Sequence, residues 1–263
     1  MLQKNKKYLQ VALNSTLNEA REIISRLPIS DRILIEVGTP LIKTYGKRAI
    51  LKLREYIIEK IPDSQKNKKR MDLVSLAMLI AEIKKGKKDW KSLFSGKANP
   101  SPFFNPYIVA DLKCMDLGTR EVEIAATCGA SAATCLGRAP IETIDRFIEE
   151  CEKNNLDSMI DMMNVENPIL ILRKLKKLPN VVILHRGVDE TKENKEKQIP
   201  YYQIQQIKGN YNNILVSIAG GDTIKEIQSA VFNDADIVVL WKAFYQPSEK
   251  TEKLAREFLR EIR

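Results

Sequence analysis

The sequence predicts an α/β protein folded as one closed (β/α)8 barrel. Short apolar runs alternate with amphipathic stretches along the whole chain of 263 residues. The apolar runs show no polar face, which is typical of parallel strands covered by helices on both sides. Eight such strand–helix units fit the length of a barrel. An open doubly wound sheet is the alternative, and the lack of a G-x-G-x-x-G motif after the first run disfavours it.

Each predicted strand is a short run rich in Val, Ile, Leu or Met that ends at polar residues or glycine, which mark the edge of a sheet. The predicted strands are Leu9–Leu13, Ile33–Val37, Tyr107–Leu112, Ala132–Leu136, Met159–Met163, Val181–Leu184, Ile214–Ile218 and Ile237–Leu240.

Each predicted helix carries apolar residues at intervals of three and four, so that one face can pack on the barrel. The predicted helices are Leu17–Arg26, Leu41–Lys60, Thr119–Cys128, Ile141–Lys153, Ile169–Lys177, Ile199–Ile207, Ile224–Phe232 and Glu249–Ile262.

One stretch breaks this alternation between the second helix and the third strand. Residues 60–106 are too long for an ordinary loop, and we expect a helical, basic insertion in a single barrel domain spanning 1–263. Because it follows a helix, it should enter at the N-terminal face of the barrel, which favours oligomerisation or stability over an active-site lid. Part of the net charge of +9 lies here, but no nucleic-acid motif accompanies it, so we expect a solvated surface and no nucleic-acid partner.

The composition excludes several classes of protein. No apolar run approaches the roughly 20 residues of a membrane span, and no separate apolar signal region follows the basic N-terminus. We therefore expect a cytoplasmic location and no membrane partner. The four cysteines form no C-x-x-C pair, which argues against a zinc ribbon or a disulfide framework.

The third strand ends in the most informative segment of the chain. Asp111 and Lys113 are two residues apart, so strand alternation places both side chains on one side of the backbone. Asp116 falls in the following turn, where it can fold back or reach another subunit. Two carboxylates around one lysine indicate a site that holds a metal ion or moves a proton, and a salt-bridged strand end is the structural alternative.

Polar residues at the ends of the other strands complete a candidate site, since barrel enzymes place catalytic groups at that end. Glu36 and Asp111 are hard oxygen ligands suited to Mg²⁺. The only histidine, His185, titrates near neutrality and suits proton transfer. A Gly-Gly pair before a helix can bind phosphate through backbone N–H groups. The remaining candidates at these strand ends are Asn14, Asp161, Arg186, Gly220, Gly221 and Lys242.

The motif Asp111-x-Lys113-x-x-Asp116 resembles that of the orotidine 5′-phosphate decarboxylase superfamily, and the nearer likeness is to its 3-hexulose-6-phosphate synthase and 3-keto-L-gulonate-6-phosphate decarboxylase branch. Supporting segments are Leu9–Leu13, Glu36–Ile42, Asp161, Leu184–Gly187 and Ala219–Gly221.

The resemblance implies a (β/α)8 homodimer with shared active sites and a phosphorylated ketose as substrate. It implies that Glu36 and Asp111 help to bind Mg²⁺, which stabilises an enediolate. It further implies that Lys113 lies beside this intermediate, that Asp116 enters from the partner subunit and that His185 shuttles a proton. Asp161 on the fifth strand belongs to the same catalytic set.

Two positions depart from the family pattern. Asn14 stands where the family has aspartate, and Trp241-Lys242 replaces a Gly-Arg pair that binds phosphate. Lys242 can still contact a phosphate as a point charge, whereas Trp241 blocks a close approach of the backbone.

We therefore expect a Mg²⁺-dependent carbon–carbon lyase that acts through an enediolate, with the joining of formaldehyde to ribulose 5-phosphate, or the reverse, as the best specific reaction. One alternative is a related lyase or decarboxylase with a different substrate, non-phosphorylated or aromatic, for which Trp241 would provide a stacking surface. The other is a non-catalytic barrel whose basic insertion binds a partner or RNA.

Overall fold

The computed structural model describes residues 1–61, 105–194, 196–221, 223–245 and 247–262. Residues 1–57 and 106–263 form one compact unit. In it, eight parallel strands pair in chain order and the first pairs with the last, which closes the barrel. The predicted fold class is confirmed. The strands are β1 (Tyr8–Leu13), β2 (Ile33–Val37), β3 (Ile108–Cys114), β4 (Ala132–Leu136), β5 (Asp157–Asp161), β6 (Val181–His185), β7 (Leu215–Ala219) and β8 (Ile237–Leu240).

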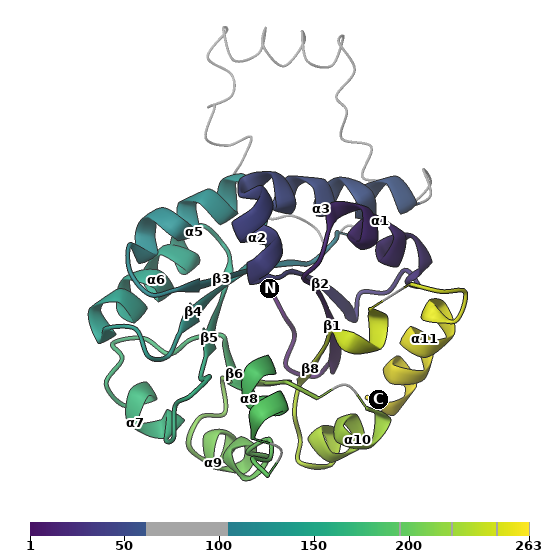
Figure 1. The fold of residues 1–263 in the computed structure, drawn as a ribbon. Helices are drawn as coiled ribbons and strands as arrows, with labels where there is room; N and C mark the ends of the chain where they lie inside the picture. The colour runs from purple at the N-terminus through teal and green to yellow at the C-terminus, as the bar shows by residue number, and fades with distance from the viewer. Residues whose placement is uncertain (62–104, 195, 222, 246, 263) are drawn as a thin grey trace, which may run out of the picture. The chain divides into compact units, whose positions relative to one another are not determined.

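Helices follow the strands and lie around the barrel (Figure 1). Most turn a buried apolar stripe toward the strands, as their sequence period predicts. The described helices are α1 (Leu17–Arg26), α2 (Thr39–Tyr45), α3 (Lys47–Lys60), α5 (Gly118–Thr127), α6 (Ile141–Lys153), α7 (Pro168–Leu172), α8 (Val188–Glu193), α9 (Tyr202–Asn210), α10 (Ile224–Phe232) and α11 (Thr251–Glu261).

The structure corrects the predicted elements at several places. The single helix predicted over 41–60 is two helices, because the chain turns at Gly46, where φ is +58°. The short helix α8 follows β6 directly and lacks any buried residue, so it carries no apolar period to predict it. Helix α7 ends at Leu172, well before the predicted end at residue 177. The predicted insertion over 60–106 lies almost entirely outside the described residues and stays a prediction.

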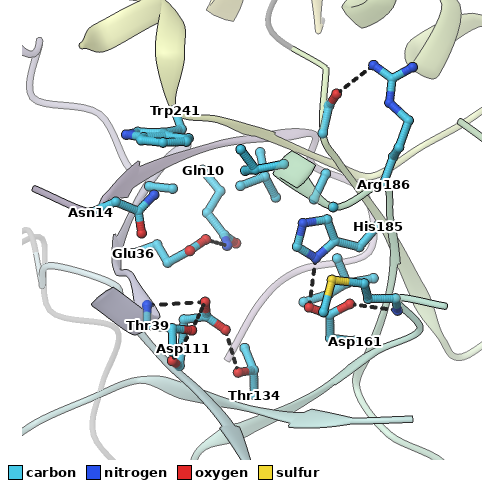
Figure 2. Close-up of a pocket in the computed structure, with 18 of the residues that line it drawn as sticks. Gln10, Asn14, Glu36, Thr39, Asp111, Thr134, Asp161, His185, Arg186 and Trp241 are labelled. Atoms are coloured by element: carbon cyan, nitrogen blue, oxygen red, sulfur yellow. Dashed lines mark hydrogen bonds and ion pairs between the residues drawn. The ribbon is translucent and has the colours of Figure 1, made fainter. Parts of the chain in front are cut away.

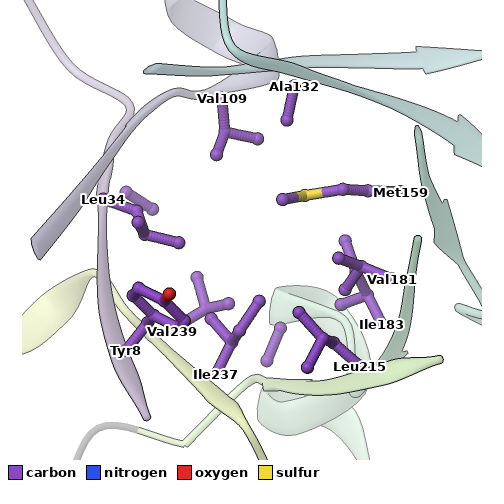
Figure 3. Packing of buried hydrophobic residues seen from close by; sticks show 12 residues of the cluster. Tyr8, Leu34, Val109, Ala132, Met159, Val181, Ile183, Leu215, Ile237 and Val239 are labelled. Carbon is purple, nitrogen blue, oxygen red and sulfur yellow. The ribbon is translucent and has the colours of Figure 1, made fainter. Parts of the chain in front are cut away.

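The barrel interior below the site is apolar. Figure 3 shows inward side chains from the barrel strands, among them Leu34, Val109, Met159 and Leu215, packed into one buried cluster. This layer fills the barrel as a core. Polar side chains on the next inward positions therefore stand on an apolar floor at the C-terminal ends of the strands.

Within the described part of the chain, no helix has both the length and the apolar character needed to cross a membrane.

Candidate active site

A cavity of about 520 Å³ opens at the C-terminal ends of the strands. Every strand of the barrel contributes a lining residue, and the start of α2 and the loops that follow β1, β5, β6, β7 and β8 contribute others. Figure 2 shows the polar side chains of β2, β3, β5 and β6 turned toward one another across this cavity. The structure thus brings together the strand-end residues that the sequence analysis singled out.

Lys113 is the central cation of the cavity. Its Nζ lies 2.9 Å from Asp161 Oδ2 and 3.2 Å from Asp111 Oδ2. Simple strand alternation does not explain this placement, because β3 changes register between Ala110 and Cys114 and Lys113 has a φ of +46°. A left-handed lysine in a strand irregularity is strained, and such strain is typical of functional sites. Burial alone would lower the pKa of Lys113, but Asp161 and Asp111 outweigh it and raise that pKa.

Two threonines fix the Asp111 carboxylate. Thr134 on β4 donates its hydroxyl to Oδ1 at 2.7 Å, and Thr39 at the start of α2 donates its hydroxyl to Oδ2 at 2.7 Å. Thr134 also accepts the backbone N–H of Lys113 at 3.0 Å, which ties β4 to the irregular part of β3. The sequence analysis missed both threonines, because a hydroxyl next to an apolar run gives no signal of its own.

Asp161 joins Lys113 to the histidine. Its Oδ2 lies 2.8 Å from His185 Nδ1, and its Oδ1 accepts the backbone N–H of Met163 at 2.9 Å. Burial alone would raise the pKa of Asp161, but His185 and Lys113 outweigh it and hold that pKa below its ordinary value. Burial would likewise lower the pKa of His185, yet the Asp161 carboxylate outweighs burial and raises it. The contact therefore stabilises the ionised form of the carboxylate and the protonated form of the imidazole.

The His185 pKa gives a direct prediction, because the chain has one histidine and its imidazole signals need no assignment. We expect an NMR titration to give a pKa above 6.5 in the wild type and a lower one in Asp161→Asn, which removes the charge responsible. Because the folded-state pKa is raised, the pair stabilises the fold below pH 6.5, and this contribution disappears as the pH rises through the folded pKa. Equal values in the two proteins would contradict the assigned contact.

Glu36 faces Asp111 from β2. Its side chain is buried, and burial together with the Asp111 charge raises the pKa of Glu36 to about 7. Its only hydrogen-bond partner among the described residues is Gln10, whose Nε2 donates to Oε2 at 2.5 Å. Glu36 is therefore a buried carboxylate with a neutral partner, beside a second carboxylate that already has a cation.

Comparison with known proteins shows the family of the chain. The model of the orotidine 5′-phosphate decarboxylase / HUMPS family matches residues 105–254, which is more than half of the chain.

The chain belongs to this family.

Relatives extend the match beyond those residues. The bifunctional enzymes Fae/Hps of Methanothrix thermoacetophila and Methanosphaera stadtmanae are 31% and 33% identical to it over 258 and 261 residues. These alignments cover 97% of the chain and 53% of each relative, so the chain spans about half the length of the curated relatives it matches. The predicted membership of the superfamily is confirmed.

Solved structures of the family have the same fold. The 3-hexulose-6-phosphate synthase of Salmonella typhimurium superposes with a TM-score of 0.69 at 20% identity, covering 97% of this chain and 98% of its own. The 3-keto-L-gulonate-6-phosphate decarboxylase of Vibrio cholerae gives a TM-score of 0.66 at 18% identity, covering 98% of this chain and 100% of its own. At this identity the likeness shows the barrel alone.

The two departures from the family pattern lie at the same side of the cavity (Figure 2). The side chain of Asn14 packs so close to Gly38 that a Cβ there would lie 1.8 Å from Asn14 Oδ1. The indole of Trp241 lies at this side of the cavity, near Asn14, and makes an edge-to-face contact with Tyr245 at 6.4 Å between ring centroids. Asn14, Trp241 and Lys242 all line the cavity, so both departures affect the surface that a substrate would touch.

The loops after β6 and β7 hold three of the residues predicted to bind the substrate, Arg186, Gly220 and Gly221. Gly220 has a φ of +100°, and a Cβ there would lie 2.2 Å from the carbonyl oxygen of Arg186, so the loop requires glycine. Arg186 Nη2 donates to the Gly220 carbonyl oxygen at 3.0 Å and contacts Glu226 Oε1 at 3.4 Å. Arg186 thus stabilises the loop that contains Gly220. Gly220, Gly221 and Arg186 line the cavity, and their contact with a substrate stays a prediction.

Asp116 does not line this cavity. It is exposed, and its Oδ1 accepts the N–H of the neighbouring Leu117 at 2.8 Å. The expectation that it enters the site of a partner subunit therefore stays a prediction.

Proposed function

We propose that this barrel is a carbon–carbon lyase of the 3-hexulose-6-phosphate synthase type, which joins formaldehyde to ribulose 5-phosphate or catalyses the reverse. The observation that carries the proposal is the position of Lys113 between Asp111 and Asp161 in the cavity of the barrel. His185 contacts the same Asp161 carboxylate at hydrogen-bond distance. Two relatives are named as bifunctional enzymes Fae/Hps, and the Hps part of that name supports the choice of reaction.

The cavity supplies the proton transfers that this reaction requires. In the direction of cleavage, a hydroxyl proton leaves the substrate, the adjacent carbon–carbon bond breaks to give formaldehyde, and the remaining enediolate takes a proton at carbon. The imidazole of His185 is placed to take the hydroxyl proton at Nε2 and to return it to the carbon of the enediolate, since Asp161 orients its Nδ1 side and leaves Nε2 for the substrate. The ammonium of Lys113 lies beside it and stabilises the negative charge of the intermediate.

The carboxylates also fit a divalent cation. Asp111 and Asp161 both contact Lys113, and Asp161 also contacts His185, whereas Glu36 has no cationic partner among the described residues. No set of three His, Cys, Asp or Glu side chains suited to a metal occurs in the described residues. Glu36 and Asp111 would therefore hold Mg²⁺ together with water and substrate oxygens, as this ion prefers. When bound, Mg²⁺ supplies Lewis-acid stabilisation of enediolate charge.

We further propose that the substrate phosphate lies toward Gly220, Gly221 and Lys242, and that the enzyme is a homodimer in which Asp116 reaches the partner's site. The exposure of Asp116 and its position outside its own cavity are compatible with this assembly.

The proposal is tested by mixing the purified protein with 3-hexulose 6-phosphate and Mg²⁺ and measuring the formaldehyde released. We expect release that stops with EDTA and returns with added Mg²⁺. Release that EDTA leaves unchanged would contradict the metal, and no release from folded protein would contradict the substrate.

A second candidate function is a related lyase or decarboxylase for a non-phosphorylated or aromatic substrate. The observation that favours it is Trp241, whose indole lines one side of the cavity where the family has glycine. An aromatic face stacks on rings and apolar groups and gives no backbone N–H to a phosphate.

The variant Trp241→Gly separates the two candidates. For a phosphoketose enzyme, we expect the variant to lower the KM for 3-hexulose 6-phosphate, because a glycine gives the phosphate access to the backbone. For an enzyme of an aromatic substrate, it should remove stabilisation by aromatic ligands in a thermal-shift measurement. The control is Phe232→Gly, which removes an exposed aromatic side chain at the end of α10 that does not line the cavity. This control should leave both the KM and the thermal shift unchanged.

A further inference from the structure

Gln10 is a buried polar residue that the mechanism above leaves without a role. It lies on β1, is 1% exposed, and lines the floor of the cavity. Its partners in register on the two neighbouring strands, Leu34 and Val239, are apolar. An amide buried among such residues is costly unless its hydrogen bonds compensate, so its contacts indicate why it is there.

The amide makes a single hydrogen bond within the described residues. Nε2 donates to Glu36 Oε2 at 2.5 Å, whereas Oε1 is buried without a partner. Figure 2 shows the Gln10 side chain directed at the Glu36 carboxylate. The opposite amide orientation would set two oxygens against each other, so Glu36 fixes the direction of the amide and the amide in turn fixes the carboxylate.

The neutrality of Gln10 distinguishes Glu36 from the other acids of the site. Asp111 and Asp161 both contact Lys113, and Asp161 also contacts His185. A lysine or arginine in place of Gln10 would orient Glu36 equally well but would cancel its charge. An apolar residue would preserve the charge and leave the carboxylate free to rotate.

We propose that Gln10 is a positioning residue that aims the Glu36 carboxylate at a divalent cation while leaving its negative charge available. This inference rests on the metal site of the proposed function and goes beyond it, because it assigns the task of orienting Glu36 to a residue of the neighbouring strand. It does not depend on which sugar phosphate the enzyme uses.

The test is calorimetric titration of metal-free protein with Mn²⁺ in the absence of substrate. We expect Gln10→Met, which keeps the length of the side chain and removes the donor, to bind Mn²⁺ about 10- to 100-fold more weakly than the wild type. Gln10→Asn retains an amide that is one methylene too short to reach Glu36. It should show the same loss, and it serves if the methionine variant does not fold.

The matched control is Gln203→Met. Gln203 is also a buried glutamine, but its Nε2 donates to the carbonyl oxygen of Glu166, and it does not line the cavity. This variant also loses a hydrogen bond made by a buried side-chain amide. It should therefore show a similar fall in melting temperature and an unchanged Mn²⁺ affinity.

The outcomes separate this inference from the proposed reaction. Mn²⁺ affinity equal in the wild type and both Gln10 variants overturns the inference, and so does a wild type that binds no Mn²⁺. Weaker binding in the Gln10 variants, in a protein that releases no formaldehyde from 3-hexulose 6-phosphate, supports the inference and contradicts only the proposed substrate.

Discussion

Replacing Lys113 by alanine should lower turnover about 10²- to 10⁴-fold, which is the contribution of a well-placed proton-transfer or charge-stabilising group. The ammonium is the cation between Asp111 and Asp161, and its removal leaves two buried carboxylates to repel each other. It also removes the positive charge beside the intermediate, so kcat should fall far more than KM rises. Steady-state kinetics with the substrate that the wild type accepts provides the measurement.

The same substitution should also destabilise the fold. Breaking a buried ion pair by removing one partner costs about 3–5 kcal/mol, because the remaining charge is left uncompensated. Loss of activity must therefore be separated from loss of folded protein, which chemical denaturation and circular dichroism at the assay temperature can do.

Lys208 offers a matched control within the same chain. Its Nζ also lies between two carboxylates, 2.8 Å from Asp234 Oδ2 and 2.9 Å from Asp236 Oδ1, and its side chain is 21% exposed compared with 22% for Lys113. These groups lie outside the cavity. Lys208→Ala should reduce the free energy of unfolding and keep kcat. A folded Lys113→Ala protein with wild-type kcat would refute the role of Lys113.

Glu36→Gln should have opposite effects on activity and stability. We expect it to abolish metal-dependent turnover, because the amide removes the one carboxylate of the described site that has no cationic partner. In the metal-free protein, the same change should raise the free energy of unfolding above pH 7, because it removes a buried charge that repels Asp111.

The pH dependence follows from the direction of the pKa shift. Burial and Asp111 raise the pKa of Glu36 from 4.5 to about 7, so the folded protein holds a proton that the unfolded chain releases earlier. The contribution of Glu36 to wild-type stability should therefore fall as the pH rises from 4.5 to 7, by about 3 kcal/mol if the whole shift is realised. Glu36→Gln should lack this fall and match the wild type near pH 4.

Urea denaturation of both proteins in EDTA at pH 4 and pH 8 provides the measurement. Added Mg²⁺ should stabilise the wild type at pH 8 and have no effect on the variant, since a ligand stabilises only the state that binds it. A variant that is less stable than the wild type at pH 8 in EDTA would contradict the electrostatic account of Glu36.

The barrel could be predicted from sequence because its signals are local. Strands such as Ile33–Val37 and Ala132–Leu136 were predicted with the bounds that the structure shows, since a buried parallel strand is a continuous apolar run. Helix α8 gave no such signal, because its residues bury no apolar face. Local periodicity thus predicts elements that bury an apolar face against the barrel, and it does not predict a short helix without such a face.

The candidate acids and bases could be predicted for a related reason. Parallel strands of a barrel end on one face, so Glu36, Asp111, Asp161 and His185 were expected to meet once their strands were recognised. Their partners could not be predicted, because a hydroxyl or an amide such as Thr39 or Gln10 is common in every sequence and is informative only through its contacts.

The sequence by itself thus determined which acids and bases form the site. The contacts, charge and pKa of each group were decided by packing in the folded barrel. The register change in β3 brings Lys113 between two carboxylates, and the contact of β1 with β2 gives Glu36 a neutral partner. Such contacts join residues far apart in sequence, and charge and pKa depend on distance and burial in three dimensions. Only the folded barrel therefore distinguishes a carboxylate paired with a cation from one that keeps its charge for a ligand.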